Sequence, residues 1–332
     1  MKKYFIIYIL IFCCLIVNAQ DAKQLHETAK GLMREGDYGN AALVLNKALA
    51  LAPGDFEISK DLALDYYFNR DLTKGLEVIK PLLDRSDVDD QSFQIAGNIY
   101  KALEQNKEGE VLYKKGIKKF PKSGSLYNEY GELLSAQDNG SAINQWEKGI
   151  EQDPSYSGNY YNACKHYFFT DDKIWSIIYA EIFLNIESYS NRTAEIKNIL
   201  LDSYKKLFAD DLIKYSNGKN KFEQAFLQTM NKQSGLAANG INAASLTMIR
   251  TRFNLDWFEN YAAAFPFKLF DYHQQLLRDG IFPAYNQWIF GTAQNLSAYQ
   301  AWTSVHAVEY TDFNTFQKGR VFKMPPAQYY HK

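Results

Sequence analysis

Apolar and polar residues follow a pattern along residues 22–190 that repeats about every 34 residues. Within residues 22–55, small and apolar side chains recur at helical spacing on both sides of a turn at Gly36-Asp37-Tyr38. The recurring residues of this unit are Ala29, Ala41, Leu45, Ala48 and Pro53. The pattern predicts two amphipathic helices joined by a short turn, and the second helix should end before Pro53.

The same positions recur in the units that follow, over residues 56–89, 90–123, 124–156 and 157–190. The clearest of these units carries Phe93, Ala96, Gly97, Tyr100, Gly109, Tyr113, Gly116 and Pro121. The next carries Tyr127, Tyr130, Gly131, Leu134, Ala142, Trp146, Gly149 and Pro154. Units 56–89 and 157–190 keep fewer of the recurring residues. Small residues recur where the two helices of a unit must approach closely, and large ones fill the space between them.

This pattern resembles the tetratricopeptide repeat over about half of the chain. The resemblance implies an all-α solenoid of about five repeats, each a helix A followed by a helix B. One helix pair cannot bury its apolar face alone, so the units are expected to stack. Proteins of this family usually hold another protein or peptide, and chemistry is not their usual role.

The resemblance also implies where a partner would bind, because certain positions of helix A line the concave groove in the family. On this chain they are His26, Lys30, Lys60, Tyr67, Gln94, Asn98, Lys101, Asn128, Glu132, Tyr161 and Lys165. Family members that bind chaperone tails use a Lys and an Asn at two of these positions. Those positions hold His26/Lys30, Lys60/Leu64 and Gln94/Asn98 here, so that clamp is not reproduced. The alternative is that these residues are a solvated inner face.

Residues 191–332 do not follow the 34-residue repeat. Residues 191–209 read as a helix that caps the repeats, and a polar turn at residues 215–220 marks a boundary. We therefore assign residues 191–217 to a capping helix and linker, and residues 218–332 to a helical C-terminal domain. Aromatic residues make up 20 of the 80 residues from 253 to 332, against 15% of the chain.

A segment this rich in aromatic residues predicts a compact core or an interface. We expect it to dock on the last repeat. The expected apolar stripe is Ala298, Trp302, Val305, Phe313 and Phe316. Arg250 and Arg252 could bind a carboxylate, although solvated surface positions are expected for both. The arrangement as a whole resembles exported bacterial tetratricopeptide proteins with an uncharacterised C-terminal part.

The N-terminus has the layout of a secretory signal peptide. Met1-Lys2-Lys3 is followed by an apolar run over residues 4–17 and by Val17-Asn18-Ala19, a small-residue cleavage pattern. Cleavage after residues 1–19 would leave Gln20 as the first mature residue and no membrane span, with export to the periplasm or cell surface of a bacterium. An uncleaved membrane anchor is the alternative. Cys164 would then be the sole cysteine, and its small-residue position predicts a buried thiol.

The charge balance and a search for catalytic and metal-binding motifs argue against several classes of function. The 37 basic and 38 acidic residues nearly balance, so the chain lacks the basic stripe typical of nucleic-acid binding. The sequence contains no phosphate loop, HExxH helix, paired CxxC or GxSxG elbow. His306 and Glu309 have the spacing of a metal-binding pair, which is weak evidence on its own. We therefore expect no catalytic site, metal or cofactor.

The leading hypothesis is an exported adaptor or scaffold that binds a protein or peptide in its concave groove. One alternative is an enzyme or ligand-binding protein whose site lies in the aromatic C-terminal domain. Another is a structural component of a cell-envelope assembly.

Overall fold

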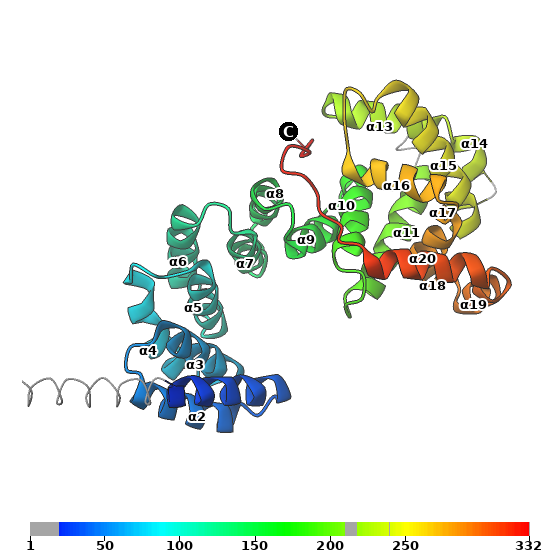
Figure 1. Cartoon of the computed structure of the whole chain (residues 1–332). Helices are drawn as coiled ribbons and strands as arrows, with labels where there is room; N and C mark the ends of the chain where they lie inside the picture. The colour runs from blue at the N-terminus through cyan, green and yellow to red at the C-terminus, as the bar shows by residue number, and fades with distance from the viewer. Residues whose placement is uncertain (1–19, 210–217, 239, 332) are drawn as a thin grey trace, which may run out of the picture. The chain divides into compact units, whose positions relative to one another are not determined.

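The computed structural model describes residues 20–209, 218–238 and 240–331 (Figure 1). These residues form α-helices, short 3-10 and π-helical turns and connecting loops, and none of them forms a strand. The all-α prediction is therefore confirmed. The predicted signal peptide and residues 215–217 of the predicted boundary turn lie outside the described residues.

By their contacts, the residues divide into two compact units, one up to Asn139 and one from Gly140 onward. The first unit begins with a helix over residues 20–35. It continues with α2 (Tyr38–Leu51), α3 (Phe56–Phe68), α4 (Leu72–Ile79), the 3-10 turn η1 (Lys80–Asp84), α5 (Asp90–Ala102), α6 (Asn106–Lys119) and α7 (Gly124–Ser135). The helices follow one another in pairs, as the 34-residue pattern predicts.

Short polar side chains set the start of these helices. Asp37, Asp55, Asp89 and Ser123 each precede a helix and accept a hydrogen bond from a backbone N–H of its first turn. Such caps satisfy donors that the helix itself leaves unpaired, and each contributes about 1 kcal/mol. The starts of α2, α3, α5 and α7 are therefore encoded locally.

A close contact between paired helices explains the glycine at position 97. A Cβ atom on Gly97 of α5 would lie 2.3 Å from the ring of Tyr113 on α6. Tyr113 is fully buried and its hydroxyl donates to Asn98, so the ring is held in place. The predicted close approach at this position is confirmed.

The second unit contains the remaining helices. They are α8 (Ala142–Gln152), α9 (Ser157–Phe168), α10 (Lys173–Ile186), α11 (Thr193–Ala209), α13 (Lys221–Asn231), α14 (Ser234–Ala237), α15 (Ala243–Asn260), α16 (Lys268–Arg278), α17 (Phe282–Asn286), the π-helical turn η2 (Gln287–Gly291), α18 (Thr292–Gln294), α19 (Leu296–Val305) and α20 (Ala307–Gly319). Every residue of α10 from Lys173 to Asn185 is buried, so this helix forms the centre of the unit.

The C-terminal helices dock on α10 and α11, as we expected. Arg250 of α15 donates to Glu181 of α10. The ring of Phe222, on α13, stacks on Trp175 of α10 with centroids 5.8 Å apart. Phe222 also contacts Trp257 and Phe270, which gives the core a continuous aromatic cluster.

Two details of the C-terminal prediction are wrong. The expected single stripe is broken, because α19 ends at Val305 and α20 begins at Ala307. Phe313 is fully buried but Val305 is 80% exposed, so they do not share a buried face. Arg250 was expected on the surface and is instead 2% exposed, which is possible because Glu181 supplies a buried counter-charge.

Cys164 is buried, as predicted, and its thiol donates to the carbonyl of Tyr161. Burial raises the pKa of this thiol, which keeps it protonated and unreactive at neutral pH. Across the described ranges, we find no helix with both the length and the apolar character that crossing a bilayer requires.

Candidate functional site

The predicted groove residues all lie on the first helix of a pair. His26 and Lys30 lie on the helix over residues 20–35. The others lie on α3 (Lys60, Tyr67), α5 (Gln94, Asn98, Lys101), α7 (Asn128, Glu132) and α9 (Tyr161, Lys165). We call these five helices the A helices; α9 belongs to the second unit and is considered with it.

Hydrogen bonds and ion pairs between side chains link successive A helices of the first unit. His26 Nε2 lies 2.6 Å from a carboxylate oxygen of Asp61 on α3. Lys60 Nζ, also on α3, lies 2.5 Å from the carboxylate of Asp89, the residue that caps α5. Each contact joins residues separated by about one repeat, 35 and 29 positions. These pairs are the first two steps of what we call the inter-repeat ladder.

The next step joins α5 to α7. Lys101 Nζ lies 2.9 Å from Glu129 and 3.1 Å from Glu132. Gln94 donates to Glu129 at 3.2 Å. Burial tends to lower the pKa of Lys101, but the two carboxylates outweigh it and raise that pKa. The ammonium is therefore charged at physiological pH, and this step persists there.

The same arrangement recurs in the second unit. Lys165 Nζ on α9 lies 2.8 Å from a carboxylate oxygen of Glu195 on α11. The hydroxyl of Tyr161 donates to the other oxygen of Glu195 at 2.5 Å. Lys165 also lies over the Tyr161 ring, 4.6 Å from its centroid.

The predicted groove residues differ in how far a partner could reach them. Lys60 and Asn128 are 5% and 4% exposed, which places both largely inside the protein. The others are half-buried. Phe68, which the prediction omitted, lies next to Tyr67 on α3, is 47% exposed and stacks on Tyr38 with centroids 5.3 Å apart.

Glu132 was among the predicted groove residues, but the other acidic members of the ladder were missed. The signal that could have found Asp61, Asp89, Glu129 and Glu195 is an acid placed about one repeat after a base on helix A. Such a separation brings two side chains onto neighbouring A helices, because each repeat adds one helix pair to the stack.

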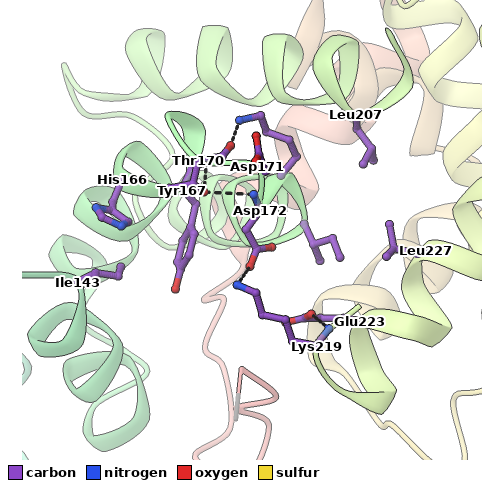
Figure 2. Close-up of a pocket in the computed structure, with 12 residues that line it drawn as sticks. Ile143, His166, Tyr167, Thr170, Asp171, Asp172, Leu207, Lys219, Glu223 and Leu227 are labelled. Atoms are coloured by element: carbon purple, nitrogen blue, oxygen red, sulfur yellow. Dashed lines mark hydrogen bonds and ion pairs between the residues drawn. The ribbon is translucent and has the colours of Figure 1, made fainter. Parts of the chain in front are cut away.

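The second unit contains a pocket of about 410 Å³ (Figure 2). Ile143, His166 and Tyr167 form one side of it in this view, and Leu227, Glu223 and Lys219 lie opposite. The lining is completed by Thr170, Asp171, Asp172, Lys173, Ile174 and Leu207. Its volume lies in the range of small-molecule sites.

Several charged groups around this pocket have hydrogen-bond or ion-pair partners within the second unit. Lys219 Nζ lies 2.8 Å from Asp172, as the dashed line in Figure 2 marks. Lys173 donates to the backbone carbonyls of Phe168 and Thr170. Glu223 accepts a 2.7 Å hydrogen bond from the indole nitrogen of Trp175. The pocket therefore combines apolar walls with polar groups that hold the structure around it.

The sequence matches no family model and no curated protein. Among solved structures, the chain is similar to TTC0263, a tetratricopeptide-repeat protein of Thermus thermophilus, with 13% identity, coverage of 55% of this chain and 98% of that one, and a TM-score of 0.46. A tetratricopeptide-repeat protein from Parabacteroides merdae is 14% identical over 72% of this chain and 92% of its own, with a TM-score of 0.42. YrrB, a tetratricopeptide-repeat protein with an unusual peptide-binding site, is 18% identical over 51% and 87%, with a TM-score of 0.36.

The deciding observation is internal to the molecule. Its helices come in pairs with the period of about 34 residues, and small residues lie where paired helices touch. The helix pairs of this chain therefore have the tetratricopeptide-repeat fold. Its repeats carry the inter-repeat ladder on their A helices, which is the surface that the family resemblance assigns to partner binding.

The second unit also contains a buried polar cluster, which shares no residue with the A-helix surface or with the lining of the pocket. Glu181 accepts hydrogen bonds from Arg250 and, at 2.8 Å, from the Tyr285 hydroxyl, and lies 2.8 Å from His273 Nε2. Burial opposes ionisation, but the charges of Arg250 and His273 prevail and lower the pKa of Glu181 to about 2. Burial lowers the pKa of His273. Since all four residues are at most 3% exposed, we assign this cluster to the core.

His306 and Glu309 do not act as a pair. The His306 ring stacks on Trp302, with centroids 4.2 Å apart, and Glu309 accepts a hydrogen bond from the backbone of Ala284. Among the described residues, no three His, Cys, Asp or Glu side chains are grouped so that they could hold a metal ion.

Proposed function

We propose that this chain is an exported adaptor that binds a protein or peptide along the A helices of its first unit. The observation that carries the proposal is the inter-repeat ladder, which joins the helix over residues 20–35 to α3, α3 to α5, and α5 to α7. Side chains held in this way lose little conformational entropy when a partner binds, and preorganisation of this kind favours affinity.

Accessible groups on the same helices would supply the contacts. Lys30 is half-buried and pairs with Glu27 of its own helix, so a partner carboxylate could reach its ammonium. The exposed Phe68 and the half-buried Tyr67 next to it provide an aromatic surface of the kind enriched at binding hot spots. Export would place this adaptor in the periplasm or at the cell surface, as the sequence of residues 1–19 suggests.

The test compares two double variants of the full mature chain. Lys30→Glu with Phe68→Ala changes the proposed surface at exposed groups, and Lys115→Glu with Val111→Ala makes the same kinds of change on α6. Partners captured from the native envelope with the wild-type protein should be lost with the first variant and kept with the second. Equal capture by both variants would contradict the proposed surface. Lys60 is unsuitable for this test, because it is buried and its replacement would perturb folding.

Export has a separate test. N-terminal sequencing of protein from the envelope fraction should give Gln20 or a neighbouring residue, and an intact Met1 on exported protein would contradict cleavage.

A second candidate function is the binding of a small molecule in the pocket of Figure 2, which its volume of about 410 Å³ favours. Leu227→Trp would fill this pocket from one side. A ligand that co-purifies with the wild-type protein in native mass spectrometry should then be absent from the variant.

A further inference from the structure

The C-terminal residues of the described chain form an extended segment that lies across the second unit. We call residues 320–331 the C-terminal strap. Figure 1 draws it in red, leaving α20 and running toward α8 and α9. The strap has no helix of its own, and its two halves are held differently.

The first half belongs to the core. Phe322 and Met324 are 6% and 5% exposed. The Arg320 guanidinium lies 4.3 Å from the centroid of the Tyr272 ring and donates to Asn185 of α10 at 2.6 Å. These contacts anchor the start of the strap on α10 and α16.

The second half lies on the surface and is held by half-buried side chains. Tyr329 donates its hydroxyl to Glu147 of α8. The Tyr330 ring stacks on Phe222 with centroids 4.7 Å apart, and its carbonyl accepts a 2.9 Å hydrogen bond from Asn220.

His331 makes further contacts with the second unit. Its Nε2 lies 2.7 Å from the hydroxyl of Tyr167 on α9, and its ring lies 4.9 Å from that of Trp175, centroid to centroid. Residues 329–331 thus occupy a surface formed by Glu147, Tyr167, Trp175, Asn220 and Phe222, which we call the strap surface.

The polar groups of the strap surface have partners that do not depend on the strap. Glu147 accepts hydrogen bonds from Tyr167 and Tyr179, each at 2.9 Å, in addition to the one from Tyr329. The Trp175 indole N–H is satisfied by Glu223. Asn220 caps α13 through its side-chain oxygen. Release of the second half would therefore leave these polar groups paired, and the backbone N–H of Lys268 would lose the Gln328 side-chain oxygen that accepts from it.

We propose that the strap surface is a docking site for an extended peptide with two consecutive aromatic residues, and that residues 328–331 occupy it in cis until such a partner displaces them. The occupant seen in the structure defines the chemistry of the partner. An aromatic hydroxyl meets Glu147, a flat aromatic ring stacks on Phe222, and a backbone carbonyl accepts from Asn220.

This site is distinct from the A-helix surface of the first unit and does not rest on the adaptor function proposed for that surface. The pocket of Figure 2 shares Tyr167 with the strap surface and could receive a further side chain of a longer peptide. Because residues 328–331 are tethered, a partner must compete with a high effective concentration, so binding by the wild-type chain is weakened.

The test uses full-length chains and a labelled peptide with the sequence of residues 325–331, Pro-Pro-Ala-Gln-Tyr-Tyr-His. The variant Tyr329→Ala with Tyr330→Ala removes the competing side chains. Fluorescence polarisation should show the peptide binding at least about tenfold more tightly to this variant than to the wild-type protein. A peptide with both tyrosines replaced by serine should bind neither, and Glu147→Gln in the same double variant should weaken binding of the original peptide.

Equal affinity for both proteins, or no binding to a folded variant, would overturn the proposal. If the double variant is unfolded, amide hydrogen exchange in the wild-type chain tests the proposal instead. The amides of residues 328–331 should then exchange at least about tenfold faster than those of residues 322–324. Equal protection of the two halves would show that the strap is one rigid part of the core.

Discussion

Each unit contains a buried carboxylate, and the two differ in their partners and in the direction in which their pKa is shifted. Glu181 of the second unit is 2% exposed and contacts Arg250, His273 and Tyr285. Asp65 of the first unit is fully buried, and neither of its carboxylate oxygens has a hydrogen-bond partner among the described residues. Burial and the nearby charges of Asp37 and Asp71 raise the pKa of Asp65 to about 7.

The difference follows from how each unit is built. Asp65 lies on α3 at the repeat position that Ile99 holds on α5 and Leu133 on α7, both of which are buried. This position is buried in the second, third and fourth repeats, so a polar residue there meets neighbours suited to an aliphatic one. The second unit is not periodic beyond its repeats, and side chains from α10, α15, α16 and α17 can converge on one charge.

Removal of Arg250 should have the largest effect. Arg250→Leu leaves the Glu181 carboxylate buried without its main counter-charge, so the free energy of unfolding of the second unit should fall by about 3–5 kcal/mol. Arg252, two residues away and exposed, is the matched control, and Arg252→Leu should change stability by at most about 0.5 kcal/mol. Urea denaturation followed by circular dichroism measures both. Equal effects of the two variants would mean that the buried pair contributes no more to the free energy of unfolding than an exposed arginine does.

The next effect concerns the close packing of the first unit. Gly97→Ala should destabilise this unit by about 2 kcal/mol, because the added methyl group overlaps the buried Tyr113 ring. Gly31→Ala, on the helix over residues 20–35, has room for a Cβ and should instead stabilise by up to about 1 kcal/mol through helix propensity. The melting temperatures of the two variants and the wild-type protein measure these effects. A gain in stability for Gly97→Ala would show that the helices separate easily at this contact.

Asp65 should make the first unit less stable as pH rises. Its pKa is raised in the folded state, so the folded protein binds the proton more tightly, and the stabilisation present below about pH 4 is lost between about pH 4 and 7. Asp65→Asn should remove this dependence and add about 2 kcal/mol at pH 8, after allowance for solvent screening.

Melting temperatures at pH 5 and pH 8 test this prediction. Asp84→Asn alters an exposed carboxylate of the same unit and should leave the decrease between pH 5 and pH 8 in place. Identical pH profiles for the wild-type protein and Asp65→Asn would contradict the assignment of this decrease to Asp65.

The smallest expected effect belongs to the inter-repeat ladder. Lys101→Ala removes contacts with Glu129 and Glu132 and should cost at most about 1 kcal/mol, because the side chain is partly solvated. The loss should shrink in 0.5 M salt, which screens such pairs. Lys114→Ala, which breaks an exposed pair with Glu110 within α6, should cost about 0.3 kcal/mol. A salt-independent loss well above 1 kcal/mol would make the ladder a structural element of the core.

The helix pairs could be predicted because their signals are local. Helical spacing brings Ala96 and Gly97 onto one face of α5, and a capping residue such as Asp89 marks where that helix begins. The break at His306 could not be predicted in this way, since no proline or glycine separates α19 from α20.

The repeat period, the close contacts at its small residues and the A-helix positions follow from the sequence alone, because each depends on residues a few turns or one repeat apart. Tertiary structure alone decided that Arg250 meets Glu181, that Asp65 is buried without a partner, and that Tyr329 reaches Glu147 across 182 positions of the chain. Such pairs obey no spacing rule, since any two polar side chains can meet when the chain between them folds back. Which of them do meet is settled by the packing of the whole unit.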